Sequence, residues 1–375
     1  MNRYHFAQEE KIPSPALIYY RDQIERNTEE AIRVAGGSER LWPHVKTHKM
    51  AEMLQMQLGM GIRRFKCATA SEVAMTARAG AEHILWAYPV VGPNAVRFVR
   101  FVREFPGCTF YALCDNIVQA QGLSEAAQRE GVEANVLLDV NVGMDRTGLS
   151  PAAAPEFFRS AQALPNIRMR GLHCYDGHIH DHGLARRQER AAVGAKCASL
   201  LRAELAAQGF DCGVVIMGGT PTFPCHAHEE GVFLSPGTLF VSDHGYCSSF
   251  PDIAVQPAAA VLARVVSHPA EGLFTIDAGV KAISADASPR GVIAGMEDKC
   301  EPVLCNEEHW VFSMRAGFAQ ERPAIGTILY VIPGHICPTN AMYDAAYVCS
   351  GGQLVGIWRV AARDRVGDVS LGELL

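Results

Sequence analysis

The sequence predicts an α/β protein with a (β/α)8 barrel of the TIM type followed by a β-rich domain, and two observations carry this prediction. Up to about residue 250, short runs rich in β-branched and aromatic residues alternate with segments of helical periodicity. Such alternation is typical of a parallel sheet with crossover helices. Beyond about residue 252, strand-like runs follow one another with few helical segments between them, which indicates a second, mainly β domain.

The expected barrel strands are short, and their number is close to eight, which favours a closed barrel over an open sheet. They are ALIYY (16–20), LWPHVK (41–46), RRFKCAT (63–69), HILWAY (83–88), TFYALCD (109–115), ANVLLDV (134–140), RMRGLHCY (168–175), GVVIMGG (213–219) and FLSPG (233–237). Segments of helical character separate most of them. These are 22–35, 49–59, 70–79, 94–104, 116–130, 151–163 and 184–208.

The second domain is expected to consist of strands with turns between them. The strand-like runs are 258–268, 272–279, 309–315, 326–333, 345–350 and 353–363. We therefore assign residues 1–252 to the barrel domain, with the first residues free to join the β domain, and residues 253–375 to the C-terminal domain.

Composition limits the function classes. Of the 375 residues, 49% are hydrophobic and 20% charged, which suits a globular protein with a large core. The net charge of −6 comes without a long basic run, so no nucleic-acid or membrane partner is expected. No signal-peptide core and no run of about 18 apolar residues occurs. The 12 cysteines form no CxxC pair, which indicates reduced thiols of a cytoplasmic protein.

The segment PHVKTHK (43–49) concentrates two lysines and two histidines. It has three interpretations: a solvated basic loop, a pair of metal-binding histidines, or a lysine held for covalent chemistry. Barrel enzymes carry their sites at the C-terminal ends of the strands, where Lys46 would follow LWPHV. A desolvated lysine among cations has a lowered pKa and can form a Schiff base. His44 and His48 are expected to assist by charge or hydrogen bonding, and Lys49 to begin the next helix.

Two glycine-containing turns follow late barrel strands, GGTPTFP (218–224) and SPGT (235–238). Backbone N–H groups in such turns, together with the hydroxyl of Thr220 or Thr222, can surround a phosphate. The pair resembles the phosphate site common in this fold. The alternative interpretation is a plain connection between strand and helix.

Other polar residues also fall at strand ends. Arg146, in NVGMDRTG, can hydrogen-bond an anionic oxygen such as a phenolate or form a surface salt bridge. His173 and Tyr175 end the strand 168–175. In the following YDGHIHDH, His178 is nearest the strand end and is expected to act as an acid–base group. A metal site built from the three histidines of this loop is the alternative.

His335 and Cys337 stand two residues apart in HICPT, within the β-rich part. Residues i and i+2 of a strand point to the same face, so both can reach one metal. Imidazole and thiolate suit zinc. Two protein ligands leave positions open for water or substrate. A buried cysteine next to an unrelated histidine is the alternative.

Taken in order, PHVKTHK, NVGMDRTG, YDGH, GGTPTFP, SPGT and HICPT resemble the pyridoxal-phosphate-dependent D-threonine aldolase and D-serine dehydratase family. The resemblance covers nearly the whole chain and implies the alanine-racemase-like fold, fold type III, with homodimers. It also implies the following residue roles. Lys46 holds the cofactor; Gly219, Thr220, Gly237 and Thr238 bind its phosphate; Arg146 lies near its phenolic oxygen; Tyr175 lines the ring pocket; and His335 and Cys337 bind a divalent metal, zinc or manganese.

The resemblance implies a lyase that acts on D-β-hydroxy-α-amino acids. We expect retro-aldol cleavage to glycine and an aldehyde, with His178 or a metal-bound water as the base. D-serine dehydration, with Lys46 removing the α-proton, is the alternative that Cys337 favours, because the aldolases carry aspartate there. Leu41-Trp42 also replaces the arginine expected before Pro43. A non-catalytic cofactor-binding barrel and a zinc hydrolase are the alternatives from other classes.

Overall fold

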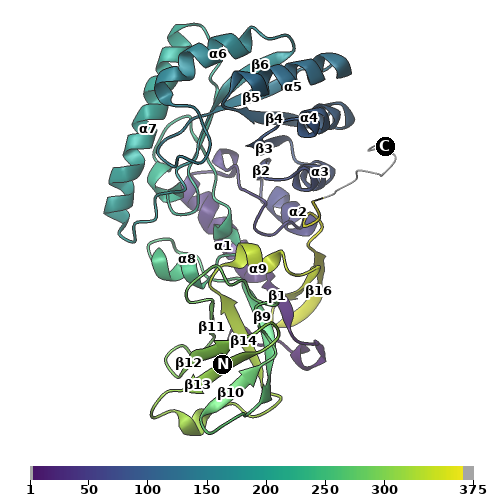
Figure 1. Cartoon of the computed structure of the whole chain (residues 1–375), viewed down its shortest axis with the longest axis vertical. Helices are drawn as coiled ribbons and strands as arrows, with labels where there is room; N and C mark the ends of the chain where they lie inside the picture. The colour runs from purple at the N-terminus through teal and green to yellow at the C-terminus, as the bar shows by residue number, and fades with distance from the viewer. Residues whose placement is uncertain (1–2, 366–375) are drawn as a thin grey trace. The chain divides into compact units, whose positions relative to one another are not determined.

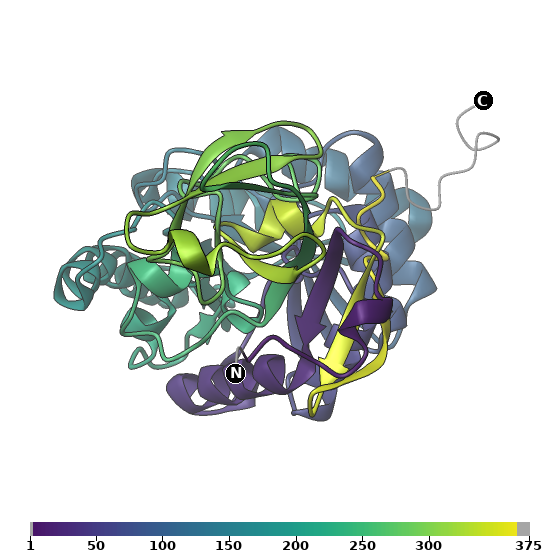
Figure 2. The ribbon, with the colours of Figure 1, turned by 90° about the horizontal axis from the view of Figure 1, so that it is seen from below.

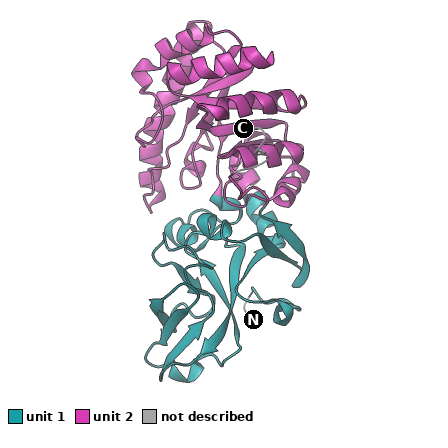
Figure 3. Ribbon diagram, turned by 45° about the vertical axis from the view of Figure 1, so that its right-hand side comes forward, with its two compact units in different colours: residues 1–30, 238–360 teal, residues 31–237, 361–375 magenta. Residues whose placement is uncertain are grey.

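The computed structural model describes residues 3–365, which fall into two compact units (Figure 3). Unit 1 comprises Met1–Glu30 and Thr238–Val360, and unit 2 comprises Ala31–Gly237 and Ala361–Leu375. The sequence placed the boundary near residue 252, whereas the structure divides the chain after Gly237. The difference arises because the segment that follows Gly237, including helix α8 (His244–Ser249), packs with the strands of unit 1.

Unit 2 contains a seven-stranded parallel sheet in which the strands follow one another in chain order (Figure 1). The strands are β2 (Arg64–Cys67), β3 (His83–Pro89), β4 (Thr109–Cys114), β5 (Ala134–Asp139), β6 (Ile167–Cys174), β7 (Val214–Met217) and β8 (Phe233–Leu234). The helices between them are α2 (Ala51–Gly59), α3 (Ala70–Arg78), α4 (Pro93–Glu104), α5 (Ile117–Glu130), α6 (Ala154–Gln162) and α7 (Leu184–Ala207). Helix α1 (Arg21–Ala35) spans the division between the units. This arrangement confirms the predicted barrel.

The segment 41–45 closes the barrel, although it is not a regular strand. The Trp42 N–H donates to the Leu234 carbonyl at 2.7 Å, which joins the segment to β8. On its other side, the Val45 N–H donates to the Lys66 carbonyl at 2.9 Å, and the Lys66 N–H donates to the Pro43 carbonyl at 2.8 Å. A proline has no N–H and interrupts a hydrogen-bond ladder, so only isolated bridges form here.

Local sequence explains where several helices begin. The Thr69 side chain accepts a hydrogen bond from the Glu72 N–H at the start of α3, and the Asn116 side chain accepts one from the Val118 N–H at the start of α5. Both are favoured N-cap residues. Helix α5 ends at Gly131, which adopts the left-handed conformation with φ of 66°, as glycine does without steric cost.

Unit 1 contains a mostly antiparallel nine-stranded sheet with the path β12-β13-β10-β9-β1-β15-β16, and with β14 joining β9 to β11. The strands are β1 (Ala16–Tyr20), β9 (Ala259–Ser267), β10 (Leu273–Ile276), β11 (Gly291–Ile293), β12 (Cys300–Cys305), β13 (Trp310–Met314), β14 (Ile328–Pro333), β15 (Ala345–Ser350) and β16 (Gln353–Arg359). A short helix, α9 (Ile336–Asn340), follows β14. The remaining short elements are the 3₁₀ helices Glu9–Lys11, Ser38–Arg40, Pro151–Ala153, Phe223–His226, Thr238–Phe240 and Ala319–Glu321.

Strand β1 belongs to unit 1 and not to the barrel. It pairs in parallel with β15 and antiparallel with β9, and Figure 2 shows this purple strand beside the yellow C-terminal strands. The assignment of ALIYY to the barrel is therefore wrong, while the allowance that the first residues join the β domain is confirmed. Residues 16–19 are all buried, and a short apolar run does not by itself reveal which sheet it enters.

Two further observations bear on the compositional expectations. All 12 cysteines are free thiols. None of the helices described between residues 3 and 365 has the length and apolar character that a bilayer crossing requires.

Candidate active site

Lys46 lies in a turn directly after the segment that closes the barrel, and its side chain is exposed. Its backbone N–H donates to Nδ1 of His44 at 3.3 Å. The neighbouring Gly237 packs closely against this loop, since a Cβ added there would lie 3.2 Å from the Cβ of His44. The structure therefore brings the lysine loop and residues 235–237 of the SPGT turn together within unit 2.

Burial disfavours the charged form of both histidines beside Lys46. Burial, followed by the charges of Lys66 and Lys46, lowers the pKa of His44 well below its usual range. Burial also lowers the pKa of His48 to about 3. Of the two kinds of assistance expected from these imidazoles, charge or hydrogen bonding, the lowered pKa values favour hydrogen bonding, because a desolvated imidazolium is unfavourable. Their hydrogen bonds remain, since Nδ1 of His48 accepts the Met50 N–H at 3.1 Å.

Lys49 forms an ion pair within unit 2. Its ammonium bonds the fully buried carboxylate of Glu72 on α3. The expectation that Lys49 begins the next helix is wrong, because Lys49 has a positive φ of 55° and α2 begins at Ala51. Of the two lysines in the motif, Lys46 is the one without such a partner within residues 3–365.

The Tyr175 ring forms the centre of a cationic group in unit 2. The guanidinium carbon of Arg146 lies 5.0 Å from the ring centroid, and Nζ of Lys66 lies 5.3 Å from it. The ring packs on glycines: a Cβ added at Gly177 would lie 2.3 Å from it, and one at Gly219 would lie 3.0 Å away. The predicted residues Tyr175, Arg146 and Gly219 are thus brought together. Lys66 joins them without having been predicted.

A buried hydrogen-bond chain supports the ring. Oδ1 of Asp139 lies 2.7 Å from Nδ1 of His173, and Thr147 donates to Oδ2 of Asp139 at 2.7 Å. Burial opposes ionisation of Asp139, but the bond from His173 outweighs it and lowers the pKa of Asp139. Burial lowers the pKa of His173. Its Nε2 is buried without a hydrogen-bond partner among the described residues. Its ring is stacked with that of Tyr175, with 6.5 Å between the two ring centroids.

The GGTPT turn is held by a buried carboxylate, Asp176. Asp176 accepts a hydrogen bond from the Thr222 hydroxyl at 2.6 Å and pairs with Nε2 of His226 at 2.7 Å. The Thr222 hydroxyl in turn accepts the Gly219 N–H at 3.1 Å. Thr222 and His226 are therefore held by Asp176, while the hydroxyl of Thr220 faces the Gly237 turn.

Removing the Asp176 carboxylate is expected to loosen this turn. In Asp176→Ala, the buried groups of Thr222 and His226 lose their partner, which costs about 3 kcal/mol in free energy of unfolding. Urea denaturation measures the loss. The control is Glu133→Ala, whose ion pair with Arg168 is about half exposed; its cost is expected to be much smaller than that of Asp176→Ala, because solvent screens an exposed ion pair. Equal costs for the two variants would contradict the structural role of Asp176.

The two glycine turns meet around polar atoms that suit a phosphate. The Gly237 N–H donates to the Thr220 hydroxyl at 3.3 Å. The Ser235 hydroxyl is buried and has no hydrogen-bond partner within the described part of the chain. Buried polar groups are normally satisfied, and backbone N–H groups with hydroxyls are the usual ligands of phosphate. Together with the unpaired Nε2 of His173, these groups fit a phosphorylated, ring-containing cofactor.

His178 lies against the loop that carries Arg146. A Cβ added at Gly143 would lie 3.1 Å from Nε2 of His178, and Nδ1 is buried with no partner among the described residues. His180 and His182 are exposed. No group of three potential metal ligands occurs within residues 3–365, so the described residues do not support the alternative of a three-histidine metal site in this loop.

In unit 1, His335 and Cys337 lie at the start of α9 and not on a strand as expected. His335 is the extended residue before the helix, and Cys337 is in its first turn. A hydrogen bond between the two side chains and the Asp286 carboxylate together outweigh burial and raise the pKa of His335 to about 9. The sequence spacing thus predicted that His335 and Cys337 lie close together. In the structure they do so because both lie at the start of α9.

A carboxylate and a hydroxyl orient this pair. Nδ1 of His335 lies 2.6 Å from Oδ2 of Asp286, and Ser284 donates to Oδ1 of the same carboxylate at 2.6 Å. This hydrogen bond occupies Nδ1 of His335, which is the way a carboxylate orients the imidazole in carboxylate–histidine–metal arrangements. The Thr238 hydroxyl lies 3.3 Å from the Cys337 sulfur. Imidazole and thiol donors fit zinc, although no group of three potential metal ligands occurs among residues 3–365.

Asp243 holds the start of α9 by hydrogen bonds to the backbone. Its carboxylate accepts the Ile336 N–H at 2.9 Å and the Tyr246 N–H at 2.8 Å. Burial raises its pKa to about 6. Neither Asp243 nor Asp286 was predicted, since each lies far from HICPT in sequence.

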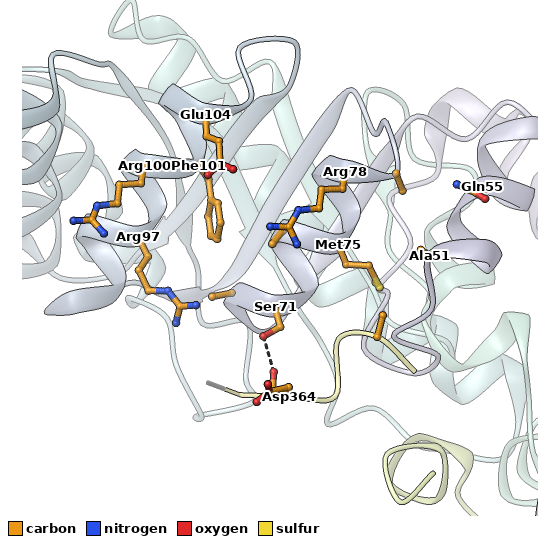
Figure 4. A pocket seen from close by; sticks show the side chains of 14 residues that line it. Ala51, Gln55, Ser71, Met75, Arg78, Arg97, Arg100, Phe101, Glu104 and Asp364 are labelled. Carbon is orange, nitrogen blue, oxygen red and sulfur yellow. Dashed lines mark hydrogen bonds between the residues drawn. The ribbon is translucent and has the colours of Figure 1, made fainter. Parts of the chain in front are cut away.

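The cavity in Figure 4 is separate from these residues. It has a volume of about 450 Å³ and is lined by α2, α3, α4 and the segment after Val360. The Ser71 hydroxyl donates to the Asp364 carbonyl at its edge. None of the predicted site residues lines it, so it is not the candidate active site.

Comparison with known proteins gives a consistent result over both units. A model of the alanine racemase N-terminal domain matches residues 20–243, and one of the putative serine dehydratase domain matches residues 258–349. The chain is 30% identical to a D-threonine aldolase of Arthrobacter sp., covering 86% of the chain and 85% of the relative. It is 26% identical to a 3-hydroxy-D-aspartate aldolase of Paracoccus denitrificans, covering 95% and 94%. A solved D-threonine aldolase of Filomicrobium marinum superimposes with a TM-score of 0.87 at 27% identity, covering 94% and 96%.

Proposed function

Since the chain belongs to the D-threonine aldolase and D-serine dehydratase family of pyridoxal-phosphate-dependent lyases, we propose that it cleaves D-threonine-type D-β-hydroxy-α-amino acids into glycine and an aldehyde. One observation carries the proposal. In unit 2, the loop of Lys46, the Thr220 and Gly237 turns and the Arg146–Tyr175 pair form one group of polar residues.

Each residue of this group has a proposed role toward the cofactor. Lys46 would hold it covalently, and Gly219, Thr220, Gly237 and Thr238 would bind its phosphate. Because the Thr238 hydroxyl is next to Cys337, its backbone N–H is the group proposed for phosphate. Arg146 would bind the phenolic oxygen, and Tyr175 would lie along the ring. When bound, the cofactor withdraws electrons from the substrate's Cα.

The chain's own acid–base groups complete the proposed reaction. His335 and Cys337 would hold a divalent metal, zinc or manganese, that lowers the pKa of the substrate's β-hydroxyl. His178 would take the β-hydroxyl proton, after which the Cα–Cβ bond breaks, with the carbonyl forming at Cβ and the electron pair remaining at Cα. Asp286 would fix His335 through its 2.6 Å hydrogen bond.

D-serine dehydration is the second candidate, and Cys337 supports it. A thiolate favours zinc, and residues 258–349 match the putative serine dehydratase domain. In this reaction Lys46 would remove the α-proton, and the β-hydroxyl would leave. The same residues serve both reactions, so the products separate them.

The deciding experiment supplies purified protein, loaded with pyridoxal phosphate, with D-threonine and with D-serine. We expect glycine and acetaldehyde from D-threonine, with activity lost on chelation and restored by zinc or manganese. Pyruvate and ammonia from D-serine would instead establish the dehydratase. A cofactor-loaded protein that makes neither product, with or without metal, would support the non-catalytic binding alternative.

We also propose that the protein acts as a homodimer in the cytoplasm on a small D-amino acid. The homodimer follows from the family resemblance, and the location from the 12 free cysteines. Neither property is needed for the residue roles given above.

A further inference from the structure

Lys66 is a buried cation of unit 2 to which neither the family resemblance nor the proposed reaction gives a role. It lies on β2 and is only 3% exposed. Its Nζ lies 5.3 Å from the Tyr175 ring centroid, and the Arg146 guanidinium carbon lies 5.0 Å from the same point. Among residues 3–365, the contact described for its ammonium is the one with the Tyr175 ring, and no ion pair or side-chain hydrogen bond of Lys66 is found.

The backbone fixes Lys66 next to the cofactor lysine. Its carbonyl accepts the Val45 N–H at 2.9 Å, and its N–H donates to the Pro43 carbonyl at 2.8 Å. The Lys46 turn begins directly after this contact. Lys66 therefore has a defined place in the site, and any movement of the segment 43–45 is coupled to it.

The charges that face Lys66 do not neutralise it. The cations are Lys46 and Arg146, and the carboxylates are Asp139 and Asp176. The imidazoles of His44 and His173, which also interact with Lys66, have pKa values lowered by burial. Burial and the charge of Lys46 lower the pKa of Lys66 to about 7.

Both carboxylates are already engaged elsewhere. Asp139 binds His173 and Thr147, and Asp176 binds Thr222 and His226. A buried ammonium whose neighbouring carboxylates are hydrogen-bonded to other groups is unfavourable. A protein therefore retains such a group where a ligand brings the opposite charge.

We propose that Lys66 binds the α-carboxylate of the amino-acid substrate beside the Tyr175 ring. The inference rests on the proposed function, because that function supplies an amino-acid ligand. The glycine turns already account for the cofactor phosphate, and Arg146 accounts for the phenolic oxygen. The α-carboxylate is the remaining anionic group that every substrate of this class carries. A carboxylate bound to an ammonium makes the strongest type of hydrogen bond available here.

The test uses ligand binding, which does not depend on turnover. D-alanine has the carboxylate but no β-hydroxyl, and D-alaninol lacks the carboxylate. Both are titrated into the protein loaded with pyridoxal phosphate, with the visible spectrum as the readout. Cofactor affinity is measured separately by adding pyridoxal phosphate to the apoprotein.

We expect Lys66→Met to weaken D-alanine binding by about 10- to 100-fold, as the loss of a hydrogen bond to a charged group does. Cofactor affinity and D-alaninol binding should change by less than about 3-fold. Lys66→Arg, which keeps the charge, should retain most of the preference for D-alanine. Lys196→Met is the control, since Lys196 is exposed on α7.

The pH dependence gives a second readout. Lys66 is charged below its pKa and neutral above it, so wild-type affinity for D-alanine relative to D-alaninol should fall as the pH rises through about 7. In Lys66→Arg this decline should be absent up to about pH 9, because arginine stays protonated.

Each contrary result has one meaning. If Lys66→Met binds D-alanine as the wild type does, Lys66 is only structural and the inference is wrong. If cofactor affinity falls as much as D-alanine affinity, Lys66 binds an oxygen of the cofactor, and the inference is again wrong. A wild-type protein that takes up no pyridoxal phosphate would overturn the proposed function first, and this inference with it.

Discussion

Replacing Lys46 by alanine is expected to remove the visible absorption of protein-bound pyridoxal phosphate and to lower D-threonine turnover by about 10³-fold or more. Lys46 is the exposed lysine that follows the barrel-closing segment and lies beside the Gly237 turn. An ε-amine is needed for a covalent bond to the cofactor's aldehyde, and alanine has none. Absorption spectroscopy after gel filtration and an assay of glycine formation measure the two effects.

The sharpest control is the second lysine of the same motif. Lys49→Arg keeps the positive charge that pairs with the buried Glu72, so the fold and the absorption band should both survive. If Lys49 were instead the cofactor lysine, Lys49→Arg would abolish the band, because a guanidinium does not form this bond. Retention of the band in Lys46→Ala together with its loss in Lys49→Arg would reverse the assignment.

The barrel could be predicted because its signal is local. Parallel strands buried by crossover helices produce apolar runs separated by helical stretches, and β2 to β8 follow this pattern. Strand β1 has the same kind of sequence, yet it pairs with β9 and β15. Partner choice depends on contacts more than 200 residues away along the chain, and periodicity contains no information about them.

The candidate site shows the same limit. Residues at strand ends, such as Lys46, Arg146 and Tyr175, could be named because barrel topology gathers strand ends. Lys66 was missed, although a lysine between Phe65 and Cys67 in a strand-like run is itself a signal. Asp286 could not be found from sequence, because it reaches His335 across 49 residues. The strand conformation predicted for His335 and Cys337 was wrong for a simpler reason, because HICPT begins a short helix.

Replacing His335 by alanine is expected to remove the bound metal and to lower turnover by about 100-fold or more, whichever of the two lyase reactions the protein carries out. His335 and Cys337 are its only protein ligands predicted here, so losing the imidazole leaves one thiolate. A single thiolate does not hold zinc against chelators. Elemental analysis of the dialysed protein gives the metal content per chain, and the absorption band of the cofactor should persist.

Asp286→Asn tests whether the orientation of the His335 imidazole matters, since the imidazole itself remains present. The amide can accept a hydrogen bond from Nδ1 of His335 but lacks the charge that strengthens it, so metal affinity should fall by about 10- to 100-fold while excess metal restores turnover. His228→Ala, which removes an exposed histidine, should keep both metal and activity. Full metal content in His335→Ala would show that other residues bind the metal. Unchanged turnover in the metal-free protein would show that a side chain of the protein deprotonates the β-hydroxyl without the metal. His178 would then be the first residue to test.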